Sequence, residues 1–105
     1  MTFNEQFLPK IYDLTKIYTI RDSNRHGETF IVNDICFIVQ VIDSFLVCEL
    51  KKRLHSEMYN PIQFGFDTRD EMDLYYWKWF NEKRFYEWDR LTLHQILYYG
   101  HENTL

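Results

Sequence analysis

The stretch that decides the fold runs from residue 31 to residue 50 and reads IVNDICFIVQVIDSFLVCEL. It permits either one long buried helix or several antiparallel strands. We take residues 33–34 and 43–44 as two-residue turns and residues 23–27 as a hairpin loop, and pair the strands across them. One face then collects only apolar residues: Tyr18, Ile20, Phe30, Val32, Ile35, Phe37, Val39, Val41, Leu46, Cys48 and Leu50. This outcome and the many Ile and Val residues favour a four-stranded antiparallel meander over the long helix.

The segments before and after this stretch predict two helices and a short apolar segment. Residues 1–15 have the apolar spacing of a helix, and Pro9 requires either a start near Leu8 or a kink. A short helix is expected over residues 50–58. Residues 62–66 then predict either a short fifth strand or an apolar loop attached to the core.

The C-terminal third predicts two further helices. Thr68 followed by Glu71 is a capping box, which opens a helix from about residue 69 toward residue 90, either continuous or broken near 81–83. A similar pattern at residues 92–95 predicts a short helix that Gly100 ends. We therefore expect one α+β domain over residues 1–105, with a four- or five-stranded antiparallel meander packed against N- and C-terminal helices.

Composition and charge exclude several classes of protein. The chain has 105 residues, a net charge of −4 and 46% hydrophobic residues, which is the balance of an ordered chain. The longest apolar run, residues 35–39, is too short to cross a bilayer, and charges interrupt the start of the chain, so a cytoplasmic location is expected. Cys36 and Cys48 lack the spacing of a zinc site or a disulfide framework, and both are predicted to be buried.

No motif for catalysis is found in the sequence. The four histidines are scattered, the three glycines are isolated, and no serine or cysteine has the surroundings of a nucleophile. Acidic residues near residue 70 suit the start of a helix better than a cation site. We expect a protein that is not an enzyme and holds no metal and no cofactor.

The strongest signal is aromatic: eight rings lie within the fourteen residues 75–88. On a helix these rings would spread almost all round, and one sheet face cannot cover them all. Tyr and Trp dominate the energetics of protein interfaces. The predicted partner-binding residues are therefore the rings Tyr75, Tyr76, Trp77, Trp79, Tyr86 and Trp88, with the acidic residues Asp67, Asp70, Glu71 and Asp73 as a rim. The alternative is that the same rings fill a small core.

These observations predict a small protein-binding module that occupies the surface of another protein. A phage or mobile-element accessory protein, such as an inhibitor of a nucleic-acid enzyme, fits this description. One alternative is an obligate homodimer. The other is a weak single-strand nucleic-acid binder that uses residues 51–53 and 83–90, although neighbouring acids disfavour it. No membrane partner is expected.

Overall fold

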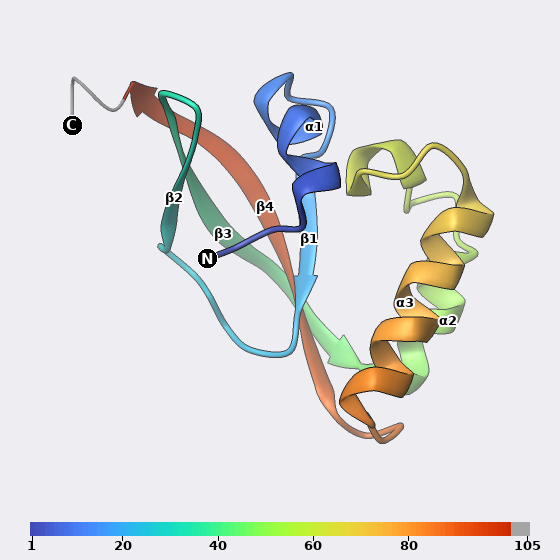
Figure 1. Ribbon diagram of the computed structural model, residues 1–105. Helices are drawn as coiled ribbons and strands as arrows, with labels where there is room; N and C mark the ends of the chain where they lie inside the picture. The colour runs from blue at the N-terminus through green and yellow to red at the C-terminus, as the bar shows by residue number, and fades with distance from the viewer. Residues whose placement is uncertain (102–105) are drawn as a thin grey trace.

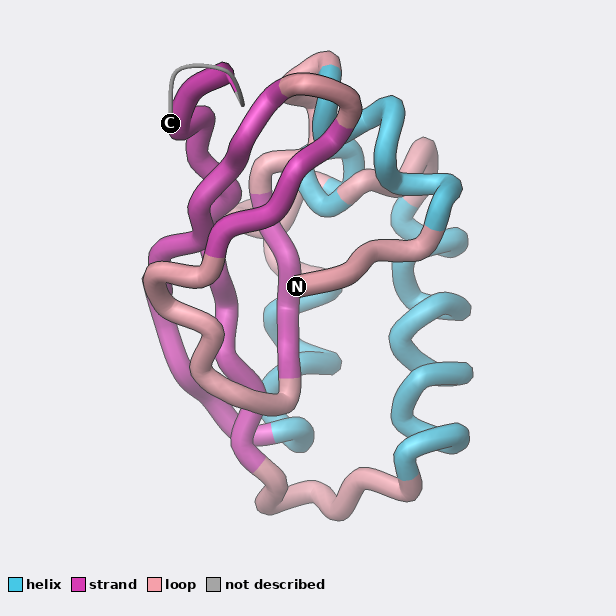
Figure 2. Tube along the Cα trace, turned by 60° about the vertical axis from the view of Figure 1, so that its left-hand side comes forward, coloured by secondary structure: helices cyan, strands magenta, loops and turns pink. Residues whose placement is uncertain are grey.

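The computed structural model describes residues 1–101, which form an α+β fold with one four-stranded sheet (Figure 1). The helical segments gather on one side of the molecule and the strands on the other (Figure 2). In chain order the elements are η1 (Glu5–Phe7), α1 (Leu8–Tyr12), β1 (Tyr18–Arg21), β2 (Thr29–Val32), β3 (Ile35–Leu46), α2 (Val47–Leu54), η2 (Pro61–Phe64), α3 (Arg69–Lys83) and β4 (Arg90–His101).

The four strands are antiparallel, in the order β1-β4-β3-β2. The two long strands β3 and β4 form the centre of the sheet, and the short strands β1 and β2 form its edges. The predicted meander is therefore wrong in its connections, because the C-terminal strand is inserted between β1 and β3. An antiparallel sheet of four strands is confirmed.

The turn predicted at residues 33–34 is confirmed. It joins β2 to β3, with Val32 opposite Ile35 and Phe30 opposite Phe37. Asn33 has φ 57°, in the left-handed region that asparagine tolerates better than most residues. The rings of Phe30 and Phe37 stack at 5.5 Å, so this part of the predicted apolar face is present.

The other two predicted turns are wrong. Residues 23–27 do not close a hairpin, because β1 pairs with β4 rather than with β2. Residues 43–44 lie inside the continuous strand β3, next to a one-residue register shift between Val41 and Asp43. Val41 lies opposite His94 and Asp43 lies opposite Leu93, so the bulge moves the odd-numbered residues of β3 to the other face. The predicted single apolar face is therefore divided between the two faces of the sheet.

Residues 45–50 do not form the predicted fourth strand. The strand β3 ends at Leu46 and α2 follows directly, which also excludes one long helix over 31–50 and moves the helix predicted at 50–58 toward the N-terminus. Residues 61–64 form the 3-10 helix η2 instead of a fifth strand. Phe64 and Phe66 are both buried, so this segment is attached to the core, but residues 61–64 of it form a 3-10 helix rather than the predicted loop.

The helix predicted at residues 92–99 is wrong, because this segment lies inside β4. Residues 91–94 are all buried, which is typical of a strand covered on both faces. The segment's β-branched and aromatic residues suit this central position, and pairing with β1 and β3 outweighs the local capping pattern.

The predicted start of α3 is confirmed. The Oγ1 atom of Thr68 accepts a hydrogen bond from the backbone N–H of Glu71 at 3.2 Å. The helix ends at Lys83, within the segment where a break was considered, and Arg84 follows with φ 55°. The predicted continuation of the helix toward residue 90 is therefore wrong. At the N-terminus, α1 begins at Leu8 with Pro9 in its first turn, as one of the two alternatives required, but it ends at Tyr12, before the predicted residue 15.

The main core lies between the sheet and the helices. Its centre contains side chains of five elements with at most 1% exposure: Ile11, Phe45, Leu50, Met72 and Leu91. Both cysteines are free; Cys36 is buried as predicted, but Cys48 is exposed because it lies in the first turn of α2 rather than on a strand.

The N-terminal segment, residues 1–4, crosses the molecule from β2 toward α3. The rings of Phe3 and Phe30 lie 4.8 Å apart, and the α-amino group of Met1 lies 3.4 Å from a carboxylate oxygen of Glu28. At the other end, Nδ2 of Asn4 donates a hydrogen bond to the hydroxyl of Tyr75 at 3.2 Å. The segment therefore closes one side of the space between the sheet and α3.

Candidate functional site: an aromatic turn and a cationic pocket

The structure separates the predicted partner-binding rings by burial. Tyr76 is only 3% exposed and belongs to the core, while Tyr75 and Trp79 are partly buried against it. Trp77 lies on the outer side of α3, 45% exposed, and Nζ of Lys51 lies 4.3 Å from the centre of its ring. The core interpretation therefore holds for Tyr76, and only the exposed rings remain candidates for partner binding.

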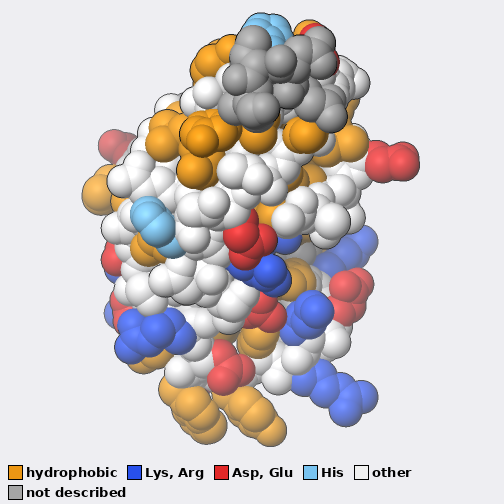
Figure 3. Space-filling view, turned by 90° about the vertical axis from the view of Figure 1, so that its left-hand side faces the viewer, with side chains coloured by type: hydrophobic (Ala, Val, Ile, Leu, Met, Phe, Trp, Pro, Cys, Tyr) orange, Lys and Arg blue, Asp and Glu red, His pale blue; other side chains and the backbone are white. Residues whose placement is uncertain are grey.

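The two most exposed rings of this group are Tyr86 and Trp88, at 63% and 70%. They lie after the end of α3 and stack on each other, with 5.4 Å between centroids and 3° between planes. We call residues 86–89 the aromatic turn. Figure 3 shows hydrophobic side chains projecting at the end of the molecule away from the grey atoms.

Backbone hydrogen bonds hold the aromatic turn in place. The N–H of Val47 donates to the carbonyl of Asp89, and the N–H of Cys48 donates to the carbonyl of Glu87, both at 2.9 Å. Within the turn, the N–H of Tyr86 donates to Oδ2 of Asp89 at 2.7 Å. The start of α2 therefore fixes the backbone on which the two exposed rings stand.

The predicted acidic rim lies at the opposite end of α3 from the aromatic turn. Asp70 and Glu71 occupy the first turn of the helix, and Asp67 forms an ion pair with Lys10 at 3.2 Å. Asp73 is partly buried, with Oδ2 3.6 Å from Nε2 of His55. A helix of this length spans about 22 Å, so these acids do not surround the two exposed rings.

Among the basic residues of the nucleic-acid alternative, Arg53 is paired with carboxylates. Arg53 pairs with Asp43 at 2.5 Å and with Glu49 at 3.6 Å, and its guanidinium lies 4.3 Å from the centre of the Phe45 ring. The hydrogen bond from Arg53 holds the pKa of Asp43 below its usual value. Arg53 therefore supports the junction of β3 and α2.

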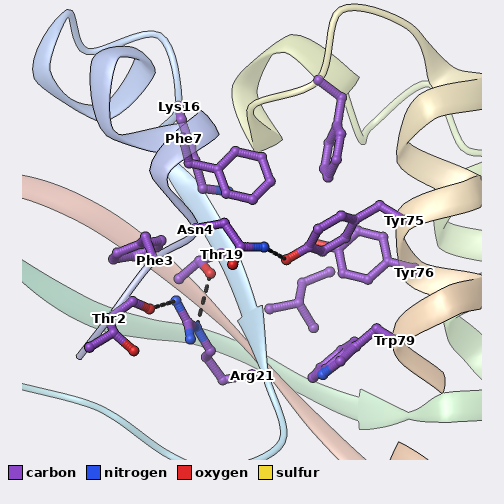
Figure 4. A pocket seen from close by; sticks show the side chains of 12 residues that line it. Thr2, Phe3, Asn4, Phe7, Lys16, Thr19, Arg21, Tyr75, Tyr76 and Trp79 are labelled. Atoms are coloured by element: carbon purple, nitrogen blue, oxygen red, sulfur yellow. Dashed lines mark hydrogen bonds between the residues drawn. The ribbon is translucent and has the colours of Figure 1, made fainter. Parts of the chain in front are cut away.

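A pocket of about 230 Å³ lies between the N-terminal segment, β1 and α3 (Figure 4). Its walls combine rings, hydroxyl groups and two cations, contributed by Thr2, Phe3, Asn4, Phe7, Lys16, Thr19, Ile20, Arg21, Phe66, Tyr75, Tyr76 and Trp79. Tyr75, Tyr76 and Trp79 project from α3 toward the side formed by Asn4 and Arg21. None of these lining residues is an aspartate or a glutamate.

Arg21 is held at the edge of this pocket by neutral groups. Its Nε donates to Oγ1 of Thr19 at 3.2 Å, its Nη2 donates to the carbonyl of Thr2 at 2.8 Å, and the guanidinium lies 4.6 Å from the centre of the Phe3 ring. Burial lowers the pKa of Arg21, and the electrostatic effect of Tyr75 and Tyr76 partly opposes this shift. No carboxylate of residues 1–101 forms an ion pair with it.

Lys16 is the second cation of the pocket and is only 3% exposed. Its Nζ donates to the carbonyl oxygens of Tyr18 at 2.8 Å and Phe64 at 2.5 Å, and lies 4.7 Å from the centre of the Phe7 ring. Burial, with the nearby charges of Arg21 and Lys10, lowers the pKa of Lys16 to about 7. The amine therefore connects β1 with η2 inside the core.

Sequence reasoning did not find the pocket, because its polar residues come from three segments far apart in the chain. Lys16 lies just before the edge strand β1, and Arg21 is the last residue of that strand. The partner of β1 is β4, which was predicted to contain a helix. One weak signal was present: Arg21 has no acidic residue at helical spacing or opposite it in the predicted meander. The aromatic residues of α3 were found, but which of them line a cavity was not.

Within the described part of the chain, no three His, Cys, Asp or Glu side chains are grouped so that they could hold a metal ion. No helix there is long and apolar enough to cross a membrane. Comparisons with protein-family models, with curated proteins and with solved structures found no match. Any assignment of function therefore depends on the fold, the aromatic turn and the pocket beside β1.

Proposed function

We propose that this protein is a non-enzymatic binding module that docks on another protein through the aromatic turn. The observation that carries the proposal is the pair of stacked, exposed rings of Tyr86 and Trp88 on a backbone fixed by α2. Large rings that the core does not need, and that stay in water, are typical of interaction surfaces.

Preorganisation strengthens this argument. Ordering a flexible loop opposes binding, but the hydrogen bonds from Val47 and Cys48 already fix the backbone of the aromatic turn. The stacked rings also restrict each other's rotamers. The turn therefore presents a rigid apolar projection, and the partner we propose has an apolar recess that receives Trp88.

Charge around the turn indicates the rim of that recess. Glu87 lies between the two rings, and Lys83 and Arg84 precede them, all exposed. A mixed rim of this kind favours a folded protein partner over a polyanion such as nucleic acid. In this proposal the protein regulates or inhibits its partner by covering the partner's surface.

The test is a pull-down from nuclease-treated host lysate with wild-type protein, Trp88→Ala and a matched control. Tyr98→Ala is the control, because Tyr98 is 55% exposed on β4 and lies outside the aromatic turn. We expect one dominant partner with the wild type and with Tyr98→Ala, and its loss with Trp88→Ala. Equal recovery by Trp88→Ala would contradict the proposal.

Two further measurements address the alternatives. A mass near 26 kDa by light scattering, twice the 13.1 kDa of the chain, would favour the homodimer instead, provided that Trp88→Ala returns the protein to a monomer. Affinity for single-stranded DNA that falls steeply with added salt would favour nucleic-acid binding.

A further inference from the structure

The pocket beside β1 carries positive charge without a compensating carboxylate. An arginine has five N–H donors, and Arg21 uses two of them, for Thr2 and Thr19. The other three have no partner in residues 1–101. Partly buried charges are normally paired, because unpaired charge is costly away from water. The site therefore has the electrostatic character of a receptor for an anion.

A second polar group in the pocket also lacks a partner. Tyr76 is 97% buried, at 3% exposure, and its hydroxyl forms no hydrogen bond with the described residues. The ring centroids of Tyr76 and Tyr75 lie 5.5 Å apart, and the hydroxyl of Tyr75 accepts a hydrogen bond from Asn4. A bound acceptor oxygen would satisfy the Tyr76 hydroxyl and Arg21 together.

The remaining walls suit a flat apolar body. The rings of Phe7, Phe66, Tyr75 and Trp79 line the pocket, and T-shaped contacts fix several of them, such as Phe7 with Phe66 at 5.4 Å. A dry cavity of about 150 Å³ holds benzene in another protein. The volume of about 230 Å³ here leaves room for one six-membered ring with a carboxylate attached.

The charge of the site favours a monoanion. Arg21 offers one full positive charge with N–H groups in a fork, which matches a carboxylate. Lys16 is directed at two carbonyl oxygens, so it adds to the local field but is not free to contact a ligand. A phosphate dianion would need a second free cation.

We propose that this pocket binds a small aromatic carboxylate, with Arg21 and the Tyr76 hydroxyl on the carboxylate and the surrounding rings on its apolar body. The proposal is independent of protein docking at the aromatic turn, which lies outside the residues that line the pocket.

The test is a titration of ¹⁵N-labelled full-length protein with benzoate, followed by the indole N–H signals of the three tryptophans. Trp79 lines the pocket, while Trp77 and Trp88 do not and serve as internal controls. We expect a saturable shift of the Trp79 signal in the millimolar range or below. Benzyl alcohol, which has the ring without the charge, and inorganic phosphate, which has charge without the ring, should bind at least about tenfold more weakly.

Two variants assign the contacts. Arg21→Met should weaken benzoate binding by about tenfold or more, while Arg90→Met, which removes the same charge at an exposed site outside the pocket, should leave it unchanged. Tyr76→Phe removes only the hydroxyl and should weaken binding several-fold. Because it keeps the buried ring, it tests the proposal even where Arg21→Met disturbs folding.

Three outcomes would overturn the proposal. The first is no saturable response of Trp79 to millimolar benzoate. The second is equal affinity for benzoate and benzyl alcohol, which would leave an apolar pocket without anion recognition. The third is unchanged benzoate affinity in both Arg21→Met and Tyr76→Phe.

Discussion

The buried amine of Lys16 makes a direct prediction about how stability depends on pH. Its pKa is about 7 in the folded protein, against an ordinary value of 10.5, mainly because burial disfavours the charged form. Between these two values the unfolded chain binds one proton more than the folded chain. Linkage then requires the free energy of unfolding to rise with pH through this window, by at most about 1.4 kcal/mol per pH unit from this group.

Substitution by methionine isolates this contribution. Lys16→Met keeps most of the apolar stem of the side chain but leaves the carbonyls of Tyr18 and Phe64 without their donor, so the variant should be less stable. The difference from wild type should also grow from pH 7 to pH 9, by up to about 2 kcal/mol. Above about pH 10 tyrosine ionisation in the unfolded state acts in the opposite direction, because burial raises the pKa of Tyr59, Tyr75 and Tyr76.

Urea denaturation followed by far-UV circular dichroism, at several pH values from 7 to 9, measures this difference. Lys52→Met is the matched control, because Lys52 is exposed on α2 and its loss should give no growing difference. A difference between wild type and Lys16→Met that stays constant over this range would refute the burial of the charged amine.

Three further predictions concern individual positions, each measured by urea denaturation. Burial lowers the pKa of His94, so on acidification this histidine takes up a proton in the unfolded chain before it does so in the folded chain. The free energy of unfolding of the wild type should therefore fall as the pH drops through about 6.5. His94→Gln should reduce this fall. Gly65→Ala should lower the free energy of unfolding by more than about 1 kcal/mol, because φ is 96° and the added Cβ would lie 2.8 Å from a ring carbon of Phe7. Gly27→Ala is the control, because φ is 82° there but the space is open. An equal loss of stability in both variants would contradict the steric argument. Thr68→Ala removes the cap of α3 and should cost about 1 kcal/mol, with an unchanged midpoint as the opposing result.

The sequence by itself determined the local features of this protein. The turn at residues 33–34 and the cap at Thr68 were predicted correctly, and the start of α1 at Leu8 and the break of α3 near residue 83 were each one of the alternatives that the sequence left open. Each depends on the backbone preferences of a few neighbouring residues, such as the left-handed φ of Asn33 or the fixed φ of Pro9. Such preferences act in any tertiary context.

Only the tertiary structure decided the long-range pairing of β4 with β1 and β3. Residues 90–101 carry a helix-capping pattern, but they form β4 because β1 and β3 supply hydrogen bonds on both sides. Strand β1 lies about seventy residues before its partner, and no local pattern encodes a pairing across that distance. The bulge near Ile42 also depends on the pairing with β4, because it lets β3 continue along β4 where the sequence alone suggests a turn.

For the candidate sites too, the sequence identified residues and the tertiary structure decided their exposure and contacts. The sequence located the aromatic residues, because composition alone shows their excess between residues 75 and 88. Which rings are buried depends on what covers each side of α3: Tyr76 faces the core, while Tyr86 and Trp88 follow the end of the helix and stay exposed. The pocket around Arg21 exists only because the N-terminal segment and α3 meet beside an edge strand, and that contact is a property of the folded chain.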